Sequence, residues 1–200
     1  MQTKFYTGPM FSGKTRKLVM SLERYVIAKR HVAWFEPVQD TRGGSHGNYI
    51  ATRMQELKSS EYVHAKVISD PSEIIPYVED LLMQGIDINA VYIDEYHMLQ
   101  FQRQFFYDYQ KSKANNLKLY FSGLMAGSDA NVLNAAKSVL PFMDEIVKEN
   151  AICMDCGKSA NYYRYTNGVW SLENAIDTGS NYECLCHDCY MQKTKAPFTI

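Results

Sequence analysis

Short apolar runs alternate with longer segments of helical periodicity along most of the chain. Apolar runs of roughly four to eight residues favour buried strands, whereas apolar positions that recur every three or four residues favour helices. The runs that predict strands are KFYT (4–7), HVAWFEP (31–37), AVYIDE (90–95), LKLYFSGL (117–124) and a weaker one around HAKVI (64–68). Strand–helix alternation predicts right-handed crossovers and a parallel sheet covered by helices on both faces.

The segments between these strands carry the helical pattern. Leu18 and Leu22 recur at helical spacing in the first of them. Asp70 and Gly85 fit the start and the stop of a second helix. The polar, glycine-bearing stretch QDTRGGSHGNY (39–49) predicts a surface loop. The predicted helices are 13–29, about 70–85 with a kink or restart at Pro76, 100–112 and 129–139.

The character of the chain changes near 149–151. Residues beyond this point form short apolar runs, tyrosine-rich turns and cysteine pairs, without amphipathic helical patterns. Asn167-Gly168 is typical of a hairpin turn. The sequence therefore predicts two domains, a larger one over 1–150 and a small one over 151–200.

Composition excludes several classes of protein. The 200 residues are 46% hydrophobic and 22% charged with a formal net charge of −1, which argues against disorder and against a general electrostatic hold on nucleic acid. No apolar run approaches the length of a membrane span, and the amino terminus lacks the pattern of a signal peptide. A cytoplasmic protein without membrane or nucleic-acid partners is expected.

A phosphate-binding motif lies directly after the first predicted strand and opens the first predicted helix. GPMFSGKT matches G-x-x-x-x-G-K-[ST], in which glycines let backbone N–H groups surround phosphate oxygens at a helix amino terminus. Lys14 is expected to reach the β- and γ-phosphates, and Thr15 to ligate Mg²⁺. The predicted nucleotide-binding residues are Gly8, Pro9, Met10, Phe11, Ser12, Gly13, Lys14 and Thr15.

Two adjacent acids end the strand over 90–95. Neighbouring side chains on a strand point to opposite faces, so Asp94 and Glu95 share a site only where the chain leaves the sheet. A phosphate loop predicts an acid of this kind in the Mg²⁺ shell, which assigns Asp94 to the nucleotide and the metal. Glu95 either activates water, as in an ATPase, or takes the proton of a substrate hydroxyl, as in a kinase.

All five cysteines lie between Cys153 and Cys189. Four of them form two C-x-x-C pairs, a pattern typical of a structural zinc site with four thiolates and no open coordination position. The predicted zinc ligands are Cys153, Cys156, Cys186 and Cys189, and Cys184 is left over. The predicted fold is thus an α/β, P-loop NTPase-type parallel sheet flanked by helices, with a small C-terminal zinc-ribbon domain.

These motifs, in this order and at this chain length, resemble the type II thymidine kinases of cells, poxviruses and bacteria. The resemblance covers nearly the whole chain, and it rests on GPMFSGKT, on the strand that ends in Asp-Glu and on the two cysteine knuckles. Further matches are DTR (40–42), SH (45–46), AICMDC (151–156) and Tyr182.

The resemblance implies transfer of the ATP γ-phosphate to the 5′-hydroxyl of thymidine with Mg²⁺, by a homotetramer. It assigns the general base to Glu95, and it places Arg42 near the phosphates, where Lys14 also acts. The zinc-held loop closes over the base in this family. The substrate-binding residues that the resemblance suggests are Met10, Met98, Leu124, Ser128, Leu133 and Tyr182.

The sequence departs from the family on the base side. Where the family reads D-E-[GA]-Q-F-F, this chain reads DEYHML, so that His97 replaces a Gln; His97 either tunes Glu95, bonds the base or makes a local hydrogen bond. The family's L-D-G-T-F-x-R-x-x-F becomes LMAGSDANVL, with Ser128 in place of Phe and Ala130 in place of Arg. Two alternatives follow: a kinase for a 5-substituted pyrimidine deoxynucleoside, and a nucleotide-binding regulatory protein without transfer activity.

Overall fold

A parallel sheet of six strands forms the centre of the computed structural model, which describes residues 2–40, 49–166 and 182–194. Its strand order is β3-β2-β4-β5-β1-β6, and every neighbouring pair is parallel. The strands are β1 (Gln2–Thr7), β2 (His31–Pro37), β3 (Val63–Ile68), β4 (Ile88–Ile93), β5 (Lys118–Gly123) and β6 (Glu145–Lys148). The α/β class and the parallel sheet predicted from the sequence are confirmed.

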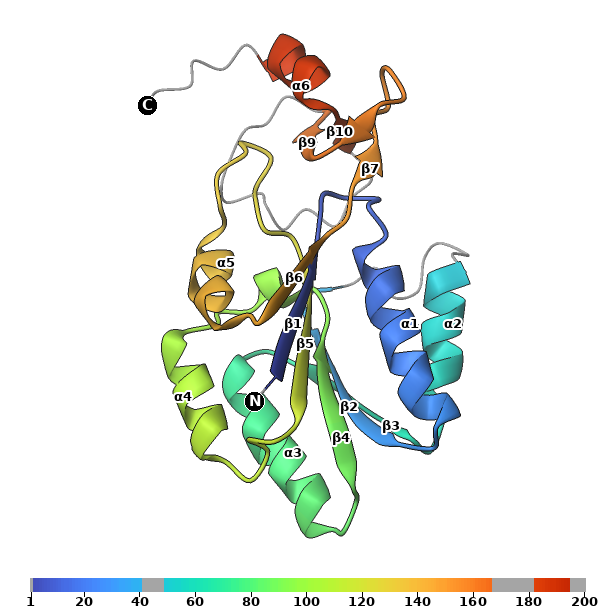
Figure 1. The fold of residues 1–200 in the computed structure, drawn as a ribbon, viewed down its shortest axis with the longest axis vertical. Coiled ribbons are helices and arrows are strands. Elements are labelled where there is room, and N and C mark those ends of the chain that lie inside the picture. The colour runs from blue at the N-terminus through green and yellow to red at the C-terminus, as the bar shows by residue number, and fades with distance from the viewer. Residues whose placement is uncertain (1, 41–48, 167–181, 195–200) are drawn as a thin grey trace.

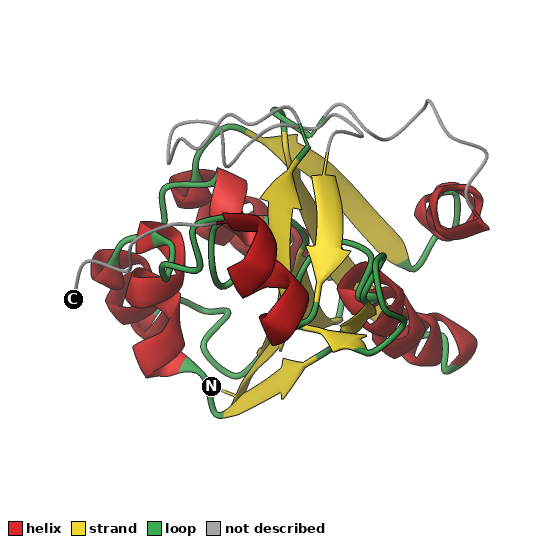
Figure 2. Cartoon of the chain, turned by 90° about the horizontal axis from the view of Figure 1, so that it is seen from above, coloured by secondary structure: helices red, strands yellow, loops and turns green. Residues whose placement is uncertain are grey.

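Helices cover both faces of the sheet, as Figures 1 and 2 show. The helices are α1 (Lys14–Ile27), α2 (Tyr49–Lys58), α3 (Ile74–Met83), α4 (Arg103–Lys111) and α5 (Asn134–Val139), with 3₁₀ turns η1 (Pro71–Glu73), η2 (Tyr96–Met98) and η3 (Leu140–Phe142). Leu18 and Leu22 of α1 pack with Trp34 on one face. Phe105 and Tyr109 of α4 are buried in the cluster on the other. Each such apolar side chain contributes roughly 1.5–3 kcal/mol when fully buried.

Local chemistry explains the limits of the second predicted helix. The Asp70 side chain accepts a hydrogen bond from the Ser72 N–H and forms a capping box with Glu73. One 3₁₀ turn follows, and α3 then begins at Ile74, two residues before Pro76. A proline in the first helical turn is tolerated because its missing N–H has no intrahelical acceptor there.

The predicted helix over 129–139 is wrong in its first half, because α5 begins only at Asn134. The Asp129 carboxylate accepts a hydrogen bond from the Asn131 N–H, and Ala130 has φ 63°. A short bridge between Ala126 and Val132 closes this turn. An aspartate that bonds the backbone two residues ahead favours a turn over a helix.

Two elements within residues 1–150 were not predicted, and neither was the C-terminal helix over 187–194. Helix α2 (Tyr49–Lys58) follows the predicted surface loop, of which residues 41–48 lie outside the described residues. Strand β6 (Glu145–Lys148) adds the edge of the sheet beside β1. Neither has a long apolar pattern: α2 buries Met54 and Leu57, and β6 is largely exposed.

The C-terminal region lies at the carboxyl ends of the parallel strands, above β1 and β6 in Figure 1. It has two antiparallel ladders of two strands each in its described part. Its elements are β7 (Ala151–Ile152), β8 (Ser159–Ala160), β9 (Tyr162–Tyr165), β10 (Tyr182–Leu185) and α6 (His187–Thr194). The predicted Asn167-Gly168 turn lies outside the described residues. Among the helices described, none is long and apolar enough to cross a membrane.

Candidate functional site: a phosphate loop beside a four-cysteine centre

The phosphate loop joins β1 to α1 and depends on two glycines. Gly13 has φ 84°, a left-handed conformation that glycine adopts without cost, and no atom lies within 4 Å of where its Cβ would be. A Cβ on Gly8 would come within 2.3 Å of the Glu149 carbonyl oxygen. The first N–H groups of α1 have no intrahelical acceptor, so the loop presents donors and a partial positive charge. These features fit a phosphate group.

Lys14 lies close enough to Asp94 for its charge to act on the Asp94 carboxyl group. Lys14 is the first residue of α1 and is buried, as is Asp94, which follows β4 directly. Burial and the charge of Glu95 raise the pKa of Asp94 to about 7, and the nearby Lys14 ammonium partly opposes this. Thr15 is half-buried one residue further along α1. A buried carboxylate near a hydroxyl at a phosphate loop supplies the oxygen ligands that Mg²⁺ prefers.

The chain leaves the sheet between the two acids. Strand β4 ends at Ile93, and Glu95 adopts φ 44° and ψ 38°, a left-handed conformation that is uncommon outside glycine. Glu95 is nevertheless 3% exposed, so the surrounding packing holds it in place. Non-glycine residues in such conformations are concentrated at functional sites. The sequence predicted a strand over 90–95 with the chain leaving the sheet at its acids; the strand ends two residues earlier, at Ile93.

The residues after Glu95 connect the acids to the end of β5. The Tyr96 hydroxyl donates a hydrogen bond to the Leu124 carbonyl oxygen over 2.9 Å. The Leu124 N–H donates to His97 Nδ1 over 3.3 Å, and the same nitrogen lies 3.4 Å from Glu95 Oε2. A Cβ on Gly123 would meet the Tyr96 ring at 2.7 Å, so glycine permits this close approach. Of the three roles considered for His97, the local hydrogen bond and the contact with Glu95 both exist.

The four cysteines predicted to bind zinc come together. Their Sγ atoms all lie within 4.8 Å of one another, and Cys156 and Cys186 are 3.5 Å apart. Tetrahedral Zn²⁺ with Zn–S bonds of about 2.3 Å requires S···S distances of about 3.7 Å. The Gly157 N–H donates to the Cys153 carbonyl oxygen, and Gly157 has φ 74°, so the first knuckle turns tightly. The thiol set fits a structural zinc ion.

The ionisation of these thiols fits a cation at their centre. Burial opposes ionisation of Cys153, but backbone N–H groups of Cys186 and Cys156 outweigh it and lower the pKa of Cys153 to about 6. Hydrogen bonding to Cys186 and Cys156 raises the pKa of Cys189 far above its ordinary value. Four crowded thiols therefore do not ionise together on their own. A divalent cation reverses this, because it favours every thiolate at once.

Cys184 is not part of the four-cysteine cluster and has a different partner. Its thiol is fully buried and donates a hydrogen bond to the Met10 carbonyl oxygen over 2.8 Å, 174 positions away in the sequence. Burial raises the pKa of Cys184 to about 11. The neutral thiol thus ties β10 to the phosphate loop, a contact that the sequence does not reveal.

Most of the suggested substrate-binding residues gather between the phosphate loop and the C-terminal region. Met10 and Leu124 belong to one buried cluster with Cys184 and Tyr190. Leu133 and Tyr182 pack against it, and the Tyr182 ring lies 5.4 Å from that of Phe11. The Tyr190 hydroxyl donates to the Ser128 carbonyl oxygen over 2.6 Å, which brings the turn after β5 to the same place. We call this group the base-side cluster.

Two suggested residues are not joined to the base-side cluster by the structure. Met98 is buried at the end of η2, outside that cluster as the described contacts define it. Arg42 lies outside the described residues, so its place relative to the phosphate loop stays a prediction. The aromatic residues Phe101, Phe105 and Tyr109, from the segment predicted as a helix over 100–112, are buried in the core.

The phosphate loop, the strand-end acids and the four-cysteine centre define a class of protein: an α/β nucleotide-binding protein with a C-terminal thiolate metal site. Comparison with known proteins then gives the family. The model of the thymidine kinase family matches residues 1–190, and the chain belongs to this family. The resemblance found in the sequence motifs is thereby confirmed.

Individual relatives agree with the family model. The chain is 31% identical to a thymidine kinase of Mycoplasma genitalium over 200 residues, covering 99% of this chain and 87% of that protein. It is 30% identical to a thymidine kinase of Mesoplasma florum, covering 92% and 88%. Similarity extends to a cytosolic thymidine kinase of Gallus gallus at 24% identity, covering 96% and 78%.

Proposed function

We propose that this protein transfers the γ-phosphate of ATP to the 5′-hydroxyl of thymidine. The observation that carries the proposal is the juxtaposition of a phosphate loop with two buried strand-end acids in a chain of the thymidine kinase family. Lys14 binds the β- and γ-phosphates and stabilises the charge that develops during transfer. Thr15 and Asp94 hold Mg²⁺, which neutralises phosphate charge when bound.

Glu95 acts as the general base in this proposal. The left-handed turn at Glu95 separates its carboxylate from that of Asp94, and the His97 ring contacts it. A base placed in this way accepts the proton of the 5′-hydroxyl while its oxygen attacks the γ-phosphorus. Arg42 contributes further positive charge near the phosphates. Of the two roles considered for Glu95, membership of the thymidine kinase family favours proton transfer from a nucleoside hydroxyl over activation of water.

The base-side cluster receives thymidine. Met10 and Leu124 provide apolar walls, and Leu133 and Tyr182 lie beside them. Met98 and Ser128 complete the proposed lining. Because Ser128 is small and polar, this pocket also suits a pyrimidine with a larger 5-substituent, which is the second candidate substrate.

Several further features belong to the same proposal. The structural zinc ion holds the small domain over 151–200 against the phosphate loop of the domain over 1–150.

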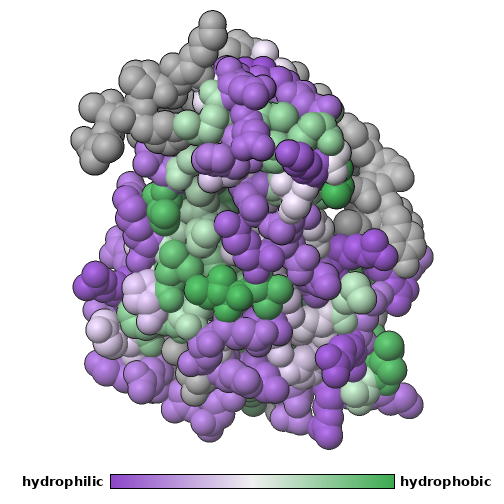
Figure 3. Space-filling model, turned by 45° about the horizontal axis from the view of Figure 1, so that its top comes forward, coloured by the Kyte–Doolittle hydropathy of each residue, from purple (hydrophilic) through white to green (hydrophobic). Residues whose placement is uncertain are grey.

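We propose that the protein is a homotetramer in the cytoplasm. The exposed edge strand β6, with Ile146 47% exposed, is one surface available for subunit contact. Figure 3 shows apolar surface gathered in a band across one face of the molecule.

A nucleoside panel tests the proposed function. The purified chain is incubated with ATP, Mg²⁺ and thymidine, deoxyuridine, 5-hydroxymethyl-deoxyuridine or deoxycytidine, and the 5′-monophosphate is measured. We expect efficient phosphorylation of thymidine. Preference for 5-hydroxymethyl-deoxyuridine establishes the second substrate instead. Absence of transfer to every nucleoside, with intact ATP binding, contradicts the kinase proposal and leaves a nucleotide-binding regulatory protein.

A further inference from the structure

The side chain of His97 lies between the proposed general base and the base-side cluster. It is 3% exposed. Its ring nitrogen Nδ1 accepts a hydrogen bond from the Leu124 N–H over 3.3 Å, and the same atom lies 3.4 Å from Glu95 Oε2. A Cβ on Gly123 would lie 2.8 Å from Nδ1, so glycine at this position lets the ring reach the end of β5. One buried nitrogen therefore contacts both the carboxylate and the residue that follows β5.

Both polar backbone groups of Leu124 are held by residues of η2. Its N–H is bonded to His97, and its carbonyl oxygen accepts the 2.9 Å hydrogen bond from the Tyr96 hydroxyl. Tyr96 is fully buried, with its ring in edge contact with two core phenylalanines. Tyr96 and His97 directly follow Glu95 in the sequence. The turn that carries the general base is thus tied to Leu124 at two points, and a displacement of Leu124 is transmitted to it.

The position of Glu95 is sensitive to such a displacement. Its backbone has the left-handed values φ 44° and ψ 38°, which persist in a non-glycine residue only where surrounding contacts hold them. A general base must lie within hydrogen-bond reach of the proton that it takes, and a misplacement of about 1 Å can lower a rate about 100-fold. The contact with the buried His97 ring is therefore a means of controlling the rate.

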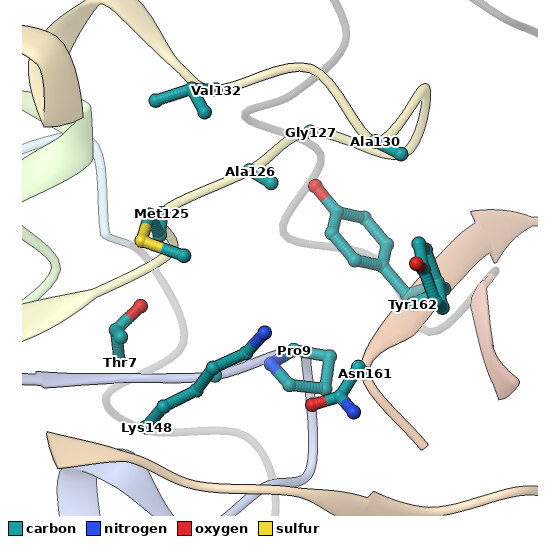
Figure 4. A pocket seen from close by; sticks show the side chains of 12 residues that line it. Thr7, Pro9, Met125, Ala126, Gly127, Ala130, Val132, Lys148, Asn161 and Tyr162 are labelled. Carbon is teal, nitrogen blue, oxygen red and sulfur yellow. The ribbon is translucent and has the colours of Figure 1, made fainter. Parts of the chain in front are cut away.

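The segment that follows Leu124 has space beside it. The turn after β5 borders a cavity of about 190 Å³, and Met125 and Val132 lie along one side of this cavity (Figure 4). Leu124 itself is buried with Met10 in the base-side cluster. Close-packed interiors transmit displacements, whereas a cavity lets a neighbouring segment shift. Leu124 can thus adjust when a nucleobase packs against the cluster, and its two hydrogen bonds pass the adjustment on to η2.

We propose that His97 is a positioning residue that couples the base-side cluster to the general base. The inference rests on the proposed function, in which Glu95 is the base and the cluster holds thymidine. A nucleobase that fills the cluster fixes Leu124, Leu124 fixes the His97 ring, and the ring holds the Glu95 carboxylate toward the 5′-hydroxyl. The fit of the nucleobase then controls turnover as well as binding, which is a form of induced fit. A nucleoside that fills the cluster incompletely is phosphorylated more slowly even at saturation.

Steady-state kinetics with thymidine and with deoxyuridine, at saturating ATP and Mg²⁺, test this coupling. Deoxyuridine lacks the 5-methyl group and fills an apolar cluster less well. We compare the native chain with His97→Leu, which keeps an apolar side chain of similar size without the Nδ1 acceptor, and with His97→Asn, whose side-chain oxygen can replace that acceptor. His64→Leu is the control, because His64 is also half-buried and hydrogen-bonded to another side chain, but it lies near the amino end of β3, away from the site.

The expected result is a loss of kcat that depends on the nucleoside. In the native chain kcat should be higher for thymidine than for deoxyuridine. His97→Leu should lower kcat for thymidine about tenfold and kcat for deoxyuridine much less, with both dissociation constants within about threefold of native. His97→Asn should recover most of the loss, and His64→Leu should match the native chain. A merely structural role of His97 would lower the active fraction equally for both nucleosides.

Tyr96→Phe is a second variant that keeps the buried ring and removes the other hydrogen bond to Leu124. We expect the same selective fall in kcat for thymidine, by a few-fold. Tyr109→Phe is its control, because the Tyr109 hydroxyl is buried and makes no hydrogen bond within the described part of the chain.

The coupling and the proposed function fail in different ways. A native chain that phosphorylates neither nucleoside contradicts the proposed function, and the coupling with it. A native chain that is active, but has equal kcat values for the two nucleosides, overturns the coupling alone. So does an active native chain whose kcat values are unchanged in both His97→Leu and Tyr96→Phe, or fall by the same factor for both nucleosides in these variants.

Discussion

The phosphate side and the base side of the candidate site are built in different ways. The phosphate side consists of two short continuous stretches, Gly8–Thr15 and Asp94-Glu95, shaped by unusual backbone conformations at Gly13 and Glu95. The base-side cluster instead takes its members from separate segments, and contacts such as Cys184 to Met10 hold it together. Backbone geometry defines the first side, and tertiary packing defines the second.

Met10 links the two sides, because it lies within the phosphate loop and within the base-side cluster. The cysteine centre is adjacent to the base side through Cys153 and Cys186, which belong to the same cluster. Loss of the metal centre should therefore weaken binding of the base more than binding of the phosphates. Substitution of Lys14 should impair the phosphate side and leave binding of the base unchanged.

Loss of a zinc ligand has the largest expected effect on the free energy of folding. Structural zinc binding provides about 10–16 kcal/mol in small thiolate sites, so Cys186→Ser should lose the ion and disorganise the base side. We expect thymidine affinity to fall at least about tenfold while affinity for an ATP analogue stays within about threefold. Metal analysis and calorimetry measure both. Cys184→Ala is the matched control and should keep about one zinc ion per chain; zinc retention by Cys186→Ser would contradict the ligand set.

Removal of the phosphate-loop lysine should impair phosphate transfer and leave the base side unchanged. Lys14→Met should lower turnover about 100- to 1,000-fold, because a positioned charge is lost where negative charge develops. Thymidine binding should be unchanged in equilibrium dialysis. Lys17→Met, which removes a half-exposed lysine on the same helix, should retain near-native turnover. An equal loss in both variants would argue against a special role for Lys14.

The buried Asp94 makes stability depend on pH. Burial and the Glu95 charge raise its pKa from 3.8 to about 7, so the folded state holds this proton more tightly than the unfolded state. This contribution to stability is present below about pH 4 and is lost as the pH rises through about 7. Urea unfolding in magnesium-free buffer should show that Asp94→Asn gains at least about 1 kcal/mol relative to the native chain between pH 5 and pH 8. The exposed Asp87→Asn should not; an unchanged slope in Asp94→Asn would refute the prediction.

The smallest effect concerns the contact between α6 and the turn after β5. Tyr190→Phe removes the hydrogen bond to the Ser128 carbonyl oxygen and should cost about 1 kcal/mol of stability, with a few-fold loss of thymidine affinity. Zinc content should not change. Tyr162→Phe is the control, since the Tyr162 ring stacks on Tyr190 at 4.7 Å and the substitution keeps that ring. Equal effects of the two variants would show that this hydrogen bond is not important.

The same contrast explains what the sequence could predict. The strands, the phosphate loop and the four cysteines follow from apolar runs and fixed spacings, which are local properties. Helix α2 was missed because it directly follows the polar, glycine-bearing stretch that predicts a loop, and strand β6 was missed because it has four residues and is largely exposed. The helix over 129–139 was predicted too long because its apolar spacing continues through a turn that Asp129 stabilises. Local patterns carry no information on a contact such as Cys184 to Met10.

In the candidate site, too, local motifs were predictable from the sequence and long-range contacts were not. Lys14, Asp94 and Glu95 lie together as the motifs predicted. The hydrogen bond from the Glu149 N–H to the Thr7 carbonyl oxygen, which joins the end of β6 to the start of the phosphate loop, had no sequence pattern, because the two residues are far apart along the chain. Long-range assembly of this kind depends on the sheet order, which places β6 beside β1.

The central claim is that Glu95 is the base for phosphate transfer to a nucleoside hydroxyl. The most direct measurement is the rate of thymidine 5′-monophosphate formation from ATP by Glu95→Gln, alongside its affinity for an ATP analogue. The account predicts a fall in turnover of about 100- to 10,000-fold with nucleotide affinity within about threefold of native. Near-native turnover by Glu95→Gln would contradict it.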